Sequence, residues 1–160
     1  MSGFVTPTTP NVTDYTTWLV GQGFLPQFLP AGSAWIEYAL NQALIIVNRY
    51  GQCVVGGMPN VAYTLAVYNC ATHIQVKITP DAKGQTFFQT MRGPAPGGFN
   101  MLGFLPGVVQ ASGDVSTNQT LLVPDAFKGL TFSDLNFMLT PWGREYLAYA
   151  QDYGSLWGLS

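Results

Sequence analysis

Apolar residues recur at helical spacing most clearly between Ser33 and Gly51. They are three or four positions apart and so share one face of a helix: Ile36, Leu40, Ala43 and Val47. Ser33 is a suitable N-terminal cap for this helix, and Gly51 is a suitable end. We therefore predict an amphipathic helix here, with its apolar face turned toward a core.

A longer helix is predicted with Pro59 in its first turn and its end at about Ile78. It carries two apolar stripes, one of Tyr63, Val67, Cys70, Ile74 and Ile78 and one of Val61, Leu65, Tyr68 and Val76. A helix that is apolar on two faces is sandwiched between partners. The stripe between them has small side chains at the start of the helix and polar side chains toward its end: Ala62, Ala66, Asn69, His73 and Lys77. We expect close helix packing at the small end and a partly exposed or interfacial His73.

Two further helices are predicted nearer the ends of the chain. Thr13 is a candidate cap for a short helix, which the Gly- and Pro-containing residues 21–30 interrupt. Near the other end, Thr140 supplies a cap and Pro141 a first-turn proline for a helix that continues to about Asp152. Aromatic side chains follow helical spacing in this last helix, and we interpret them mainly as core: Trp142, Tyr146, Tyr149 and Tyr153.

Residues 79–107 interrupt the helical pattern. Residues 85–92 can form a short helix, but residues 93–98 are almost entirely Gly and Pro and exclude a regular element. Five large apolar residues then crowd a Gly-containing segment: Phe99, Met101, Leu102, Phe104 and Leu105. A disordered linker would not carry so many, so we predict that this loop contacts a neighbouring molecule.

The pattern as a whole indicates one mainly α domain over residues 1–160, built as a small helical bundle with a long Gly/Pro-rich loop. Apolar residues 108–111 and 120–123 flank a polar stretch and are compatible with a short β-hairpin. Residues 1–12 are rich in Thr and Pro and read as an extended arm. Residues 154–160 form an uncharged, apolar C-terminal tail, where a soluble domain normally loses order.

Composition changes this picture in one respect, because only 9% of the residues are charged while 48% are hydrophobic. Ordinary soluble proteins carry about 25% charged residues. Much of the surface must therefore be apolar or uncharged, and such surfaces are usually covered by other proteins. We interpret the chain as a subunit of an assembly; a low-charge monomer solubilised by Ser, Thr, Asn and Gln is the alternative. The net charge of −2 offers no field for nucleic acid, and neither a signal peptide nor a membrane span is predicted.

Few residues can support catalysis. His73 is the only histidine, and no carboxylate lies three or four positions away to orient its ring. The candidate acids fall in loops or at helix starts, where Asp normally caps or turns the chain: Asp81, Asp114, Asp125 and Asp134. Cys53 and Cys70 are too few for a zinc site and are predicted to be buried thiols. No nucleotide-binding glycine motif occurs. We expect no enzyme, no metal and no cofactor.

Residues 121–160 resemble the end of small virion proteins of tailed bacteriophages, the head-to-tail adaptor or head completion proteins of the neck. The recognisable parts are Leu130–Thr131, Asp134–Leu135, Thr140–Arg144, Tyr146–Leu147, Ala150–Gln151 and Leu156–Ser160. Residues 35–48 and 5–7 fit more loosely, and residues 79–107 depart from the more polar, helical stretch usual there.

The resemblance implies a virion subunit, assembled in the host cytoplasm, of which twelve copies form a ring between the portal and a tail or nozzle protein. Such a ring lines a channel through which DNA passes without sequence-specific binding. The portal-docking tail would comprise Tyr153, Leu156, Trp157, Leu159 and Ser160. Contacts with neighbouring subunits are expected at Phe99, Met101, Leu102, Phe104, Arg49, Arg92 and Arg144.

Three other interpretations stay open at this point. The chain could be another neck or tail subunit, of the tube or terminator kind. It could be a module that binds an apolar ligand among Trp18, Trp35 and the Phe-rich loop. It could, least in keeping with its residues, be an enzyme that depends on His73.

Overall fold

Six helices and two short strands make up the part of the chain that the computed structural model describes: residues 9–51, 59–94, 96–101, 108–111, 120–122 and 132–153. The helices are α1 (Val12–Gly21), α2 (Ala34–Gly51), α3 (Asn60–Ile78), α4 (Phe87–Arg92), α5 (Phe132–Phe137) and α6 (Pro141–Tyr153). The predicted mainly helical class is confirmed. Among the described helices, none has the length and apolar character needed to cross a membrane.

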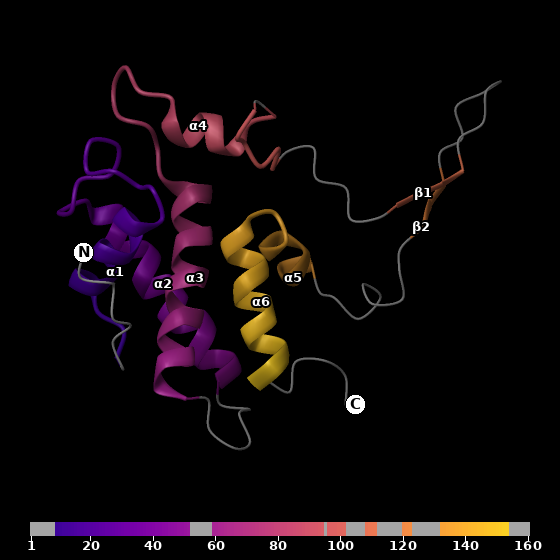
Figure 1. Ribbon diagram of the computed structural model, residues 1–160, viewed down its shortest axis with the longest axis horizontal. Helices are drawn as coiled ribbons and strands as arrows, with labels where there is room; N and C mark the ends of the chain where they lie inside the picture. The colour runs from indigo at the N-terminus through magenta and orange to yellow at the C-terminus, as the bar shows by residue number, and fades with distance from the viewer. Residues whose placement is uncertain are drawn as a thin grey trace.

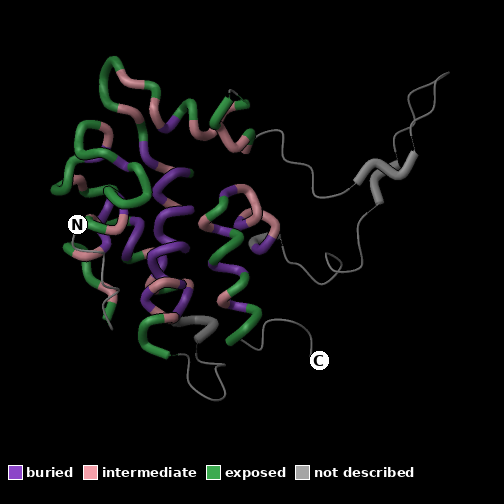
Figure 2. Tube along the Cα trace, viewed as in Figure 1, coloured by how far each residue is buried: buried purple, intermediate pink, exposed green. Residues whose placement is uncertain are grey.

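Helix α3 occupies the centre of the bundle, with α2 along one side and α6 along the other (Figure 1). The predicted sandwiching of this helix is confirmed, because nearly every residue from Thr64 to Val76 is buried (Figure 2). Asn69 and His73 of the stripe between the two apolar stripes are buried too, as are Thr72 and Gln75, which the sequence did not indicate; Lys77 is exposed. The helix begins one residue later than expected, with Pro59 as its N-cap.

Helix α2 packs on α3 as its sequence predicts. The apolar face of this helix lies entirely in the core: Ile36, Leu40, Ala43 and Val47 are all buried. At its start, the Ser33 hydroxyl accepts a weak 3.4 Å hydrogen bond from the Trp35 backbone N–H, and the Ser33 carbonyl accepts one from the Ile36 N–H at 3.0 Å. Ser33 thus occupies the capping position that was expected for it.

Helix α1 begins at a different cap from the predicted one. The Asn11 side-chain oxygen accepts a 2.9 Å hydrogen bond from the Asp14 backbone N–H, whereas Thr13 lies inside the helix. Asn and Thr are both good caps, and Asn11 is further fixed by its backbone contact with the Tyr68 hydroxyl at 3.3 Å. The connection after α1 places Phe24 and Leu29 in the core but leaves Leu25 exposed.

The adjoining ends of α3 and α4 are both capped by side chains, that of Asp81 from the turn between them and that of Arg92 from α4. The two carboxylate oxygens of Asp81 accept hydrogen bonds from the backbone N–H groups of Phe88 and Gln89 at 2.7 and 2.8 Å. From the end of α4, the Arg92 guanidinium donates to three carbonyl oxygens at the end of α3, on Val76, Lys77 and Thr79. Both helix ends thereby gain partners for groups that have none within the helix.

The two strands, β1 (Val108–Ala111) and β2 (Thr120–Leu122), pair antiparallel with each other. Val108 pairs with Leu122 and Val109 with Leu121, and the register shifts before Ala111 pairs with Thr120. Of the predicted arm at residues 1–12, residues 1–8 lie outside the described residues, whereas Asn11 caps α1 and Val12 begins it; the tail at residues 154–160 also lies outside the described residues. The described core is built mainly by the helices, with Phe24 and Leu29 added from the connection between α1 and α2.

Candidate functional site

The turn between α5 and α6 is built by the capping residues that the sequence indicated. Pro141 is the first residue of α6, and the Thr140 hydroxyl oxygen accepts a 3.0 Å hydrogen bond from the Gly143 backbone N–H. Gly143 lies against the preceding helix, so that a Cβ atom there would sit 1.9 Å from the Phe137 carbonyl oxygen and 2.9 Å from His73 Nδ1. Glycine is therefore required at this position by space.

His73 is part of this contact and is not the partly exposed residue that its polar stripe suggested. Its side chain is 1% exposed, and the centroid of its ring lies 4.8 Å from that of the Phe137 ring. His73 Nδ1 lies 2.9 Å from the Thr140 hydroxyl, which already accepts from Gly143 and can donate its own proton to the imidazole. Burial, with a smaller contribution from the Lys77 charge, lowers the pKa of His73 to about 3. His73 is thus a neutral residue that joins α3 to the α5–α6 turn.

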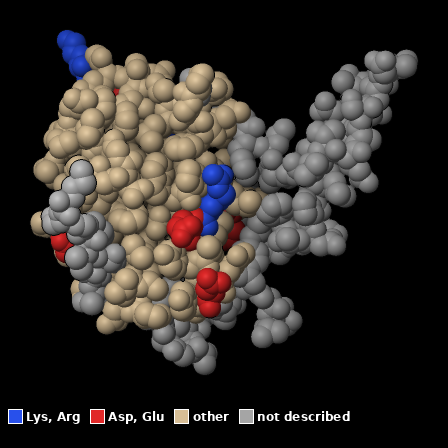
Figure 3. Space-filling view, in the orientation of Figure 1, with Lys and Arg blue, Asp and Glu red and all other residues tan. Residues whose placement is uncertain are grey.

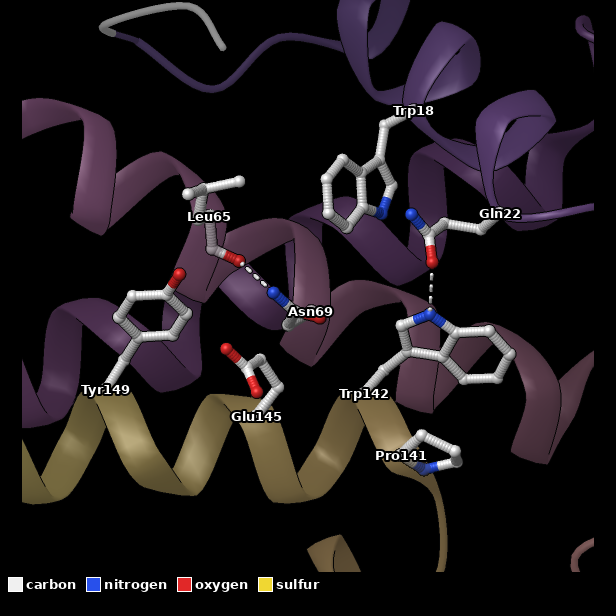
Figure 4. A pocket seen from close by; sticks show the side chains of 8 residues that line it. All are labelled: Trp18, Gln22, Leu65, Asn69, Pro141, Trp142, Glu145 and Tyr149. Carbon is white, nitrogen blue, oxygen red and sulfur yellow. Dashed lines mark hydrogen bonds between the residues drawn. The ribbon is translucent and has the colours of Figure 1, made fainter. Parts of the chain in front are cut away.

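An open groove of about 480 Å³ lies on the other side of α6, between α6, α3 and the end of α1 (Figure 4). Its aromatic lining comes from Trp18, Trp142 and Tyr149, and the remaining lining residues are Gln22, Leu65, Asn69, Pro141 and Glu145. Figure 4 shows the Glu145 side chain between those of Tyr149 and Trp142, with Trp18 and Asn69 opposite. Three separate segments of the chain therefore meet at one carboxylate.

Hydrogen bonds to neighbours fix three of the polar side chains of the groove, those of Trp142, Gln22 and Asn69. The Trp142 indole Nε1–H donates to the Gln22 amide oxygen at 3.0 Å, which joins α6 to the end of α1. The Asn69 amide nitrogen donates to the Leu65 carbonyl oxygen at 2.9 Å, which leaves the amide oxygen of Asn69 as an acceptor. Burial raises the pKa of the Tyr149 phenol above its usual value, and the Glu145 charge adds to this.

The outward face of α2 is a second candidate surface for binding a partner. Trp35, Tyr38 and Ile45 are 40%, 49% and 62% exposed, and the rings of Trp35 and Tyr38 contact each other at 6.3 Å. With Gln42 between them, these residues follow the alternating spacing of three and four that brings one helix against another. This face points away from α3, which the opposite face of α2 already covers.

The predicted contact residues have different positions. Phe99 and Met101 pack against the core of their own chain, and the Phe99 ring lies 5.6 Å from Trp142. Arg92, predicted as a contact between subunits, donates three hydrogen bonds to carbonyl oxygens at the end of α3, and its contact with another subunit stays a prediction. Arg144 is exposed and donates to the Met138 carbonyl oxygen at 3.2 Å. Tyr153 is 38% exposed at the end of α6.

The other predicted contact residues lie outside the description of side chains. Leu102, Phe104, Leu156, Trp157, Leu159 and Ser160 fall outside the described residues, and of Arg49 only the backbone is described. Among the described members of this set, Arg92 and Met101 lie together, because the Met101 N–H donates to the Arg92 carbonyl oxygen at 3.0 Å, and next to them the Phe99 N–H donates to the Met91 carbonyl oxygen. Cys70 is a buried free thiol, as predicted, and burial raises its pKa, while Cys53 lies outside the described residues.

Sequence reasoning did not find the groove, although the aromatic spacing of α6 gave part of the signal. The spacing of Trp142 and Tyr149 indicates a core stripe, and nothing in the sequence singles out Glu145. The partners on α1 and α3 are far away in the chain, so no local pattern connects them to α6. Of the residues considered for an apolar ligand, Trp18 lines the groove, whereas Trp35 lies on α2.

The described residues hold no cluster of three or more His, Cys, Asp and Glu side chains suited to a metal ion. No known protein family, curated protein or solved structure matches the chain. The surfaces of the chain, its charge and the resemblance of its C-terminal third therefore indicate its function.

Proposed function

We propose that this chain is a structural subunit of a bacteriophage virion, a ring-forming head-to-tail adaptor that joins the portal to the tail. The observation that carries the proposal is the outward face of α2, where Trp35, Tyr38 and Ile45 are exposed at the spacing of a helix–helix contact. An apolar helix face of this kind is usually covered by protein. In a ring, the face of one subunit would be covered by its neighbour.

The character of the remaining surface supports the same proposal. On the face drawn in Figure 3, charged side chains are sparse and most of the described surface is uncharged. Further large apolar side chains are exposed elsewhere on the described part of the chain: Val12, Val20, Leu25 and Val61. Sparse charge suits a subunit that is surrounded by other proteins, and a slightly negative total suits a channel that DNA must traverse without binding.

The assignment of partners rests on the C-terminal tail and on the family resemblance. The tail carries Leu156, Trp157 and Leu159 without any charge, and an aromatic side chain filling a pocket is a common energetic centre of an interface. We assign this tail to the portal and the opposite end of the subunit to a tail or nozzle protein. Twelve copies would make the ring, and the anchors would reinforce one another through effective concentration.

Two variants test the proposal at its two interfaces. Deletion of residues 154–160 should leave a folded subunit that no longer binds the portal. Tyr38→Lys combined with Ile45→Lys should leave a subunit that still binds the portal as single copies but fails to close a ring. Co-sedimentation with portal rings and light scattering measure the two effects.

Ala148→Lys is the matched control, because Ala148 is exposed on α6 and lies outside both proposed contacts. Circular dichroism checks that every variant keeps its helices. Normal incorporation of the truncated chain into particles would remove the docking tail from the proposal. Normal ring closure by the double lysine variant would show that the outward face of α2 is not the contact between subunits. The proposal would then lose its main support.

A further inference from the structure

We propose that the groove between α1, α3 and α6 is a binding site for an arginine side chain of another protein. Its position is separate from the outward face of α2, and the inference holds whether or not the chain forms a ring. It rests on the aromatic walls, on the chemistry of the polar groups between them, and on the single charge that lines the groove.

The aromatic walls provide faces on which a planar cation can stack. Trp18 and Trp142 come from different helices, and Tyr149 lies two turns along α6 from Trp142 (Figure 4). A guanidinium is attracted to the face of an aromatic ring, most strongly to that of Trp, and its aliphatic stem can pack on the same surface. Leu65 and Pro141 extend this apolar lining.

The polar groups of the groove are mainly hydrogen-bond acceptors. Glu145 contributes an exposed carboxylate, and Asn69 contributes an amide oxygen whose companion nitrogen is already bonded to Leu65. The Tyr149 hydroxyl can accept as well. Gln22 contributes little as an acceptor, because its amide oxygen already receives the Trp142 N–H. A ligand rich in donors is therefore matched to this set.

The charge in the groove selects a cation, because Glu145 is its one charged lining residue. The nearest basic residue in sequence, Arg144, is turned toward the Met138 carbonyl oxygen and does not line the groove. A guanidinium presents five donors in a planar fork and matches a carboxylate bidentately, whereas an ammonium is a compact, strongly hydrated charge. These differences favour arginine over lysine.

The groove is open to solvent, which suits a side chain that enters from a neighbouring protein surface. A single arginine should bind weakly, with a dissociation constant of about 1–10 mM, and gain its effect as part of a larger interface. The probe is therefore N-acetyl-arginine amide, titrated into the intact chain. Binding is followed by the NMR signals of the indole N–H groups of its 4 tryptophans.

The expected result is a saturable shift of the Trp18 and Trp142 signals, with the Trp35 signal unchanged. N-acetyl-citrulline amide, which has nearly the same shape without the charge, should bind at least about tenfold more weakly. Glu145→Gln should weaken arginine binding about tenfold, because it removes the charge and keeps the shape of the side chain. Asp152→Asn, which removes an exposed carboxylate further along α6, should leave binding unchanged.

Tyr149→Leu gives a second variant that keeps the carboxylate and removes one aromatic wall, and it should weaken binding about fivefold. Absence of saturable shifts at Trp18 and Trp142 would overturn the proposal, as would equal binding of the citrulline probe or an unchanged affinity in Glu145→Gln. Tighter binding of free spermidine than of the arginine probe would overturn the choice of a protein side chain. Because the assay needs no portal or ring, its failure leaves the virion proposal standing.

Discussion

The two sides of helix α6 differ in how closely they are packed, although their residues are neighbours in the chain. On one side, Gly143 lies against α3 and α5 with no room for an added methyl group, and Tyr146 is buried beside Phe137. On the other side, Trp142 and Glu145 line an open groove that reaches the end of α1. One helix thus provides both a close structural contact and an accessible surface.

The difference shows that a motif can owe its residues to packing. In the segment from Thr140 to Arg144, each residue has a local task that the structure makes visible. Thr140 caps α6 and bonds His73, Pro141 opens the helix, and Gly143 admits the neighbouring backbone. Such a segment can resemble that of another family because the same helix turn has the same requirements.

The largest effect should come from filling the closely packed side. Gly143→Ala places a methyl group against the Phe137 carbonyl oxygen and His73, and relief requires the two helices to separate. We expect a loss of about 3 kcal/mol in the free energy of unfolding, measured by urea denaturation.

Gly21→Ala is the matched control for this substitution. Gly21 ends α1, and a Cβ atom there would meet nothing within 4 Å. This variant should be neutral or stabilise the chain by up to about 1 kcal/mol. Equal effects of the two substitutions would show that the contact at Gly143 is not as close as described here.

The next effect is a pH dependence that comes from His73. Its pKa is about 3 in the folded chain and near 6.5 when unfolded, so the unfolded chain binds the additional proton between these values. Stability from this group is complete above pH 6.5 and is lost as the pH falls toward 3, by about 1.4 kcal/mol per pH unit.

His73→Gln removes this titration and can still bond Thr140. Between pH 6 and pH 4.5 the parent chain should lose about 2 kcal/mol more than the variant in urea denaturation. Carboxylates titrate in both chains at the lower end of this range, so the difference between the two chains isolates His73. Parallel stability curves would mean that the imidazole is solvated in the folded state.

The smallest effect is expected on the open side. Gln22→Ala removes the acceptor of the Trp142 indole N–H, which water can replace because this bond is exposed. We expect a loss of about 0.5 kcal/mol, against no change for Gln27→Ala in the same connection. A loss as large as that of Gly143→Ala would show that the groove is part of the core and not an accessible surface.

The helices were largely predictable from the sequence, because their signals are local. Ser33 and the apolar face of α2, or Thr140 with Pro141, indicate a helix start within a few residues. The predicted cap of α1 was wrong, since Asn11 is a competing cap two residues earlier and is fixed by Tyr68 from α3. Of two good local capping residues, the one used is therefore determined by a contact with a residue distant in sequence.

The features that could not be predicted are those in which distant segments meet. His73 has a polar stripe around it on α3, and only the arrival of Thr140 and Phe137, more than 60 residues later, buries it. The hydrogen bonds of Arg92 to the carbonyl groups at the end of α3 also join residues that no local pattern connects. The groove likewise depends on the packing angle between helices, which no single pattern encodes.

The caps that Asp81 and Arg92 provide at the adjoining ends of α4 and α3 have a consequence for the evolution of the sequence. Loss of Asp81 would remove the acceptor of two N–H groups, and loss of Arg92 would remove the donor to three carbonyl groups at the other helix end; three of these five bonds are partly buried. Each substitution weakens the connection between α3 and α4, which the other residue also stabilises. A related sequence that lacks one of the two residues is therefore under weaker selection to keep the other. In descendants and ancestors of this chain, the acid at 81 and the base at 92 should come and go as a pair.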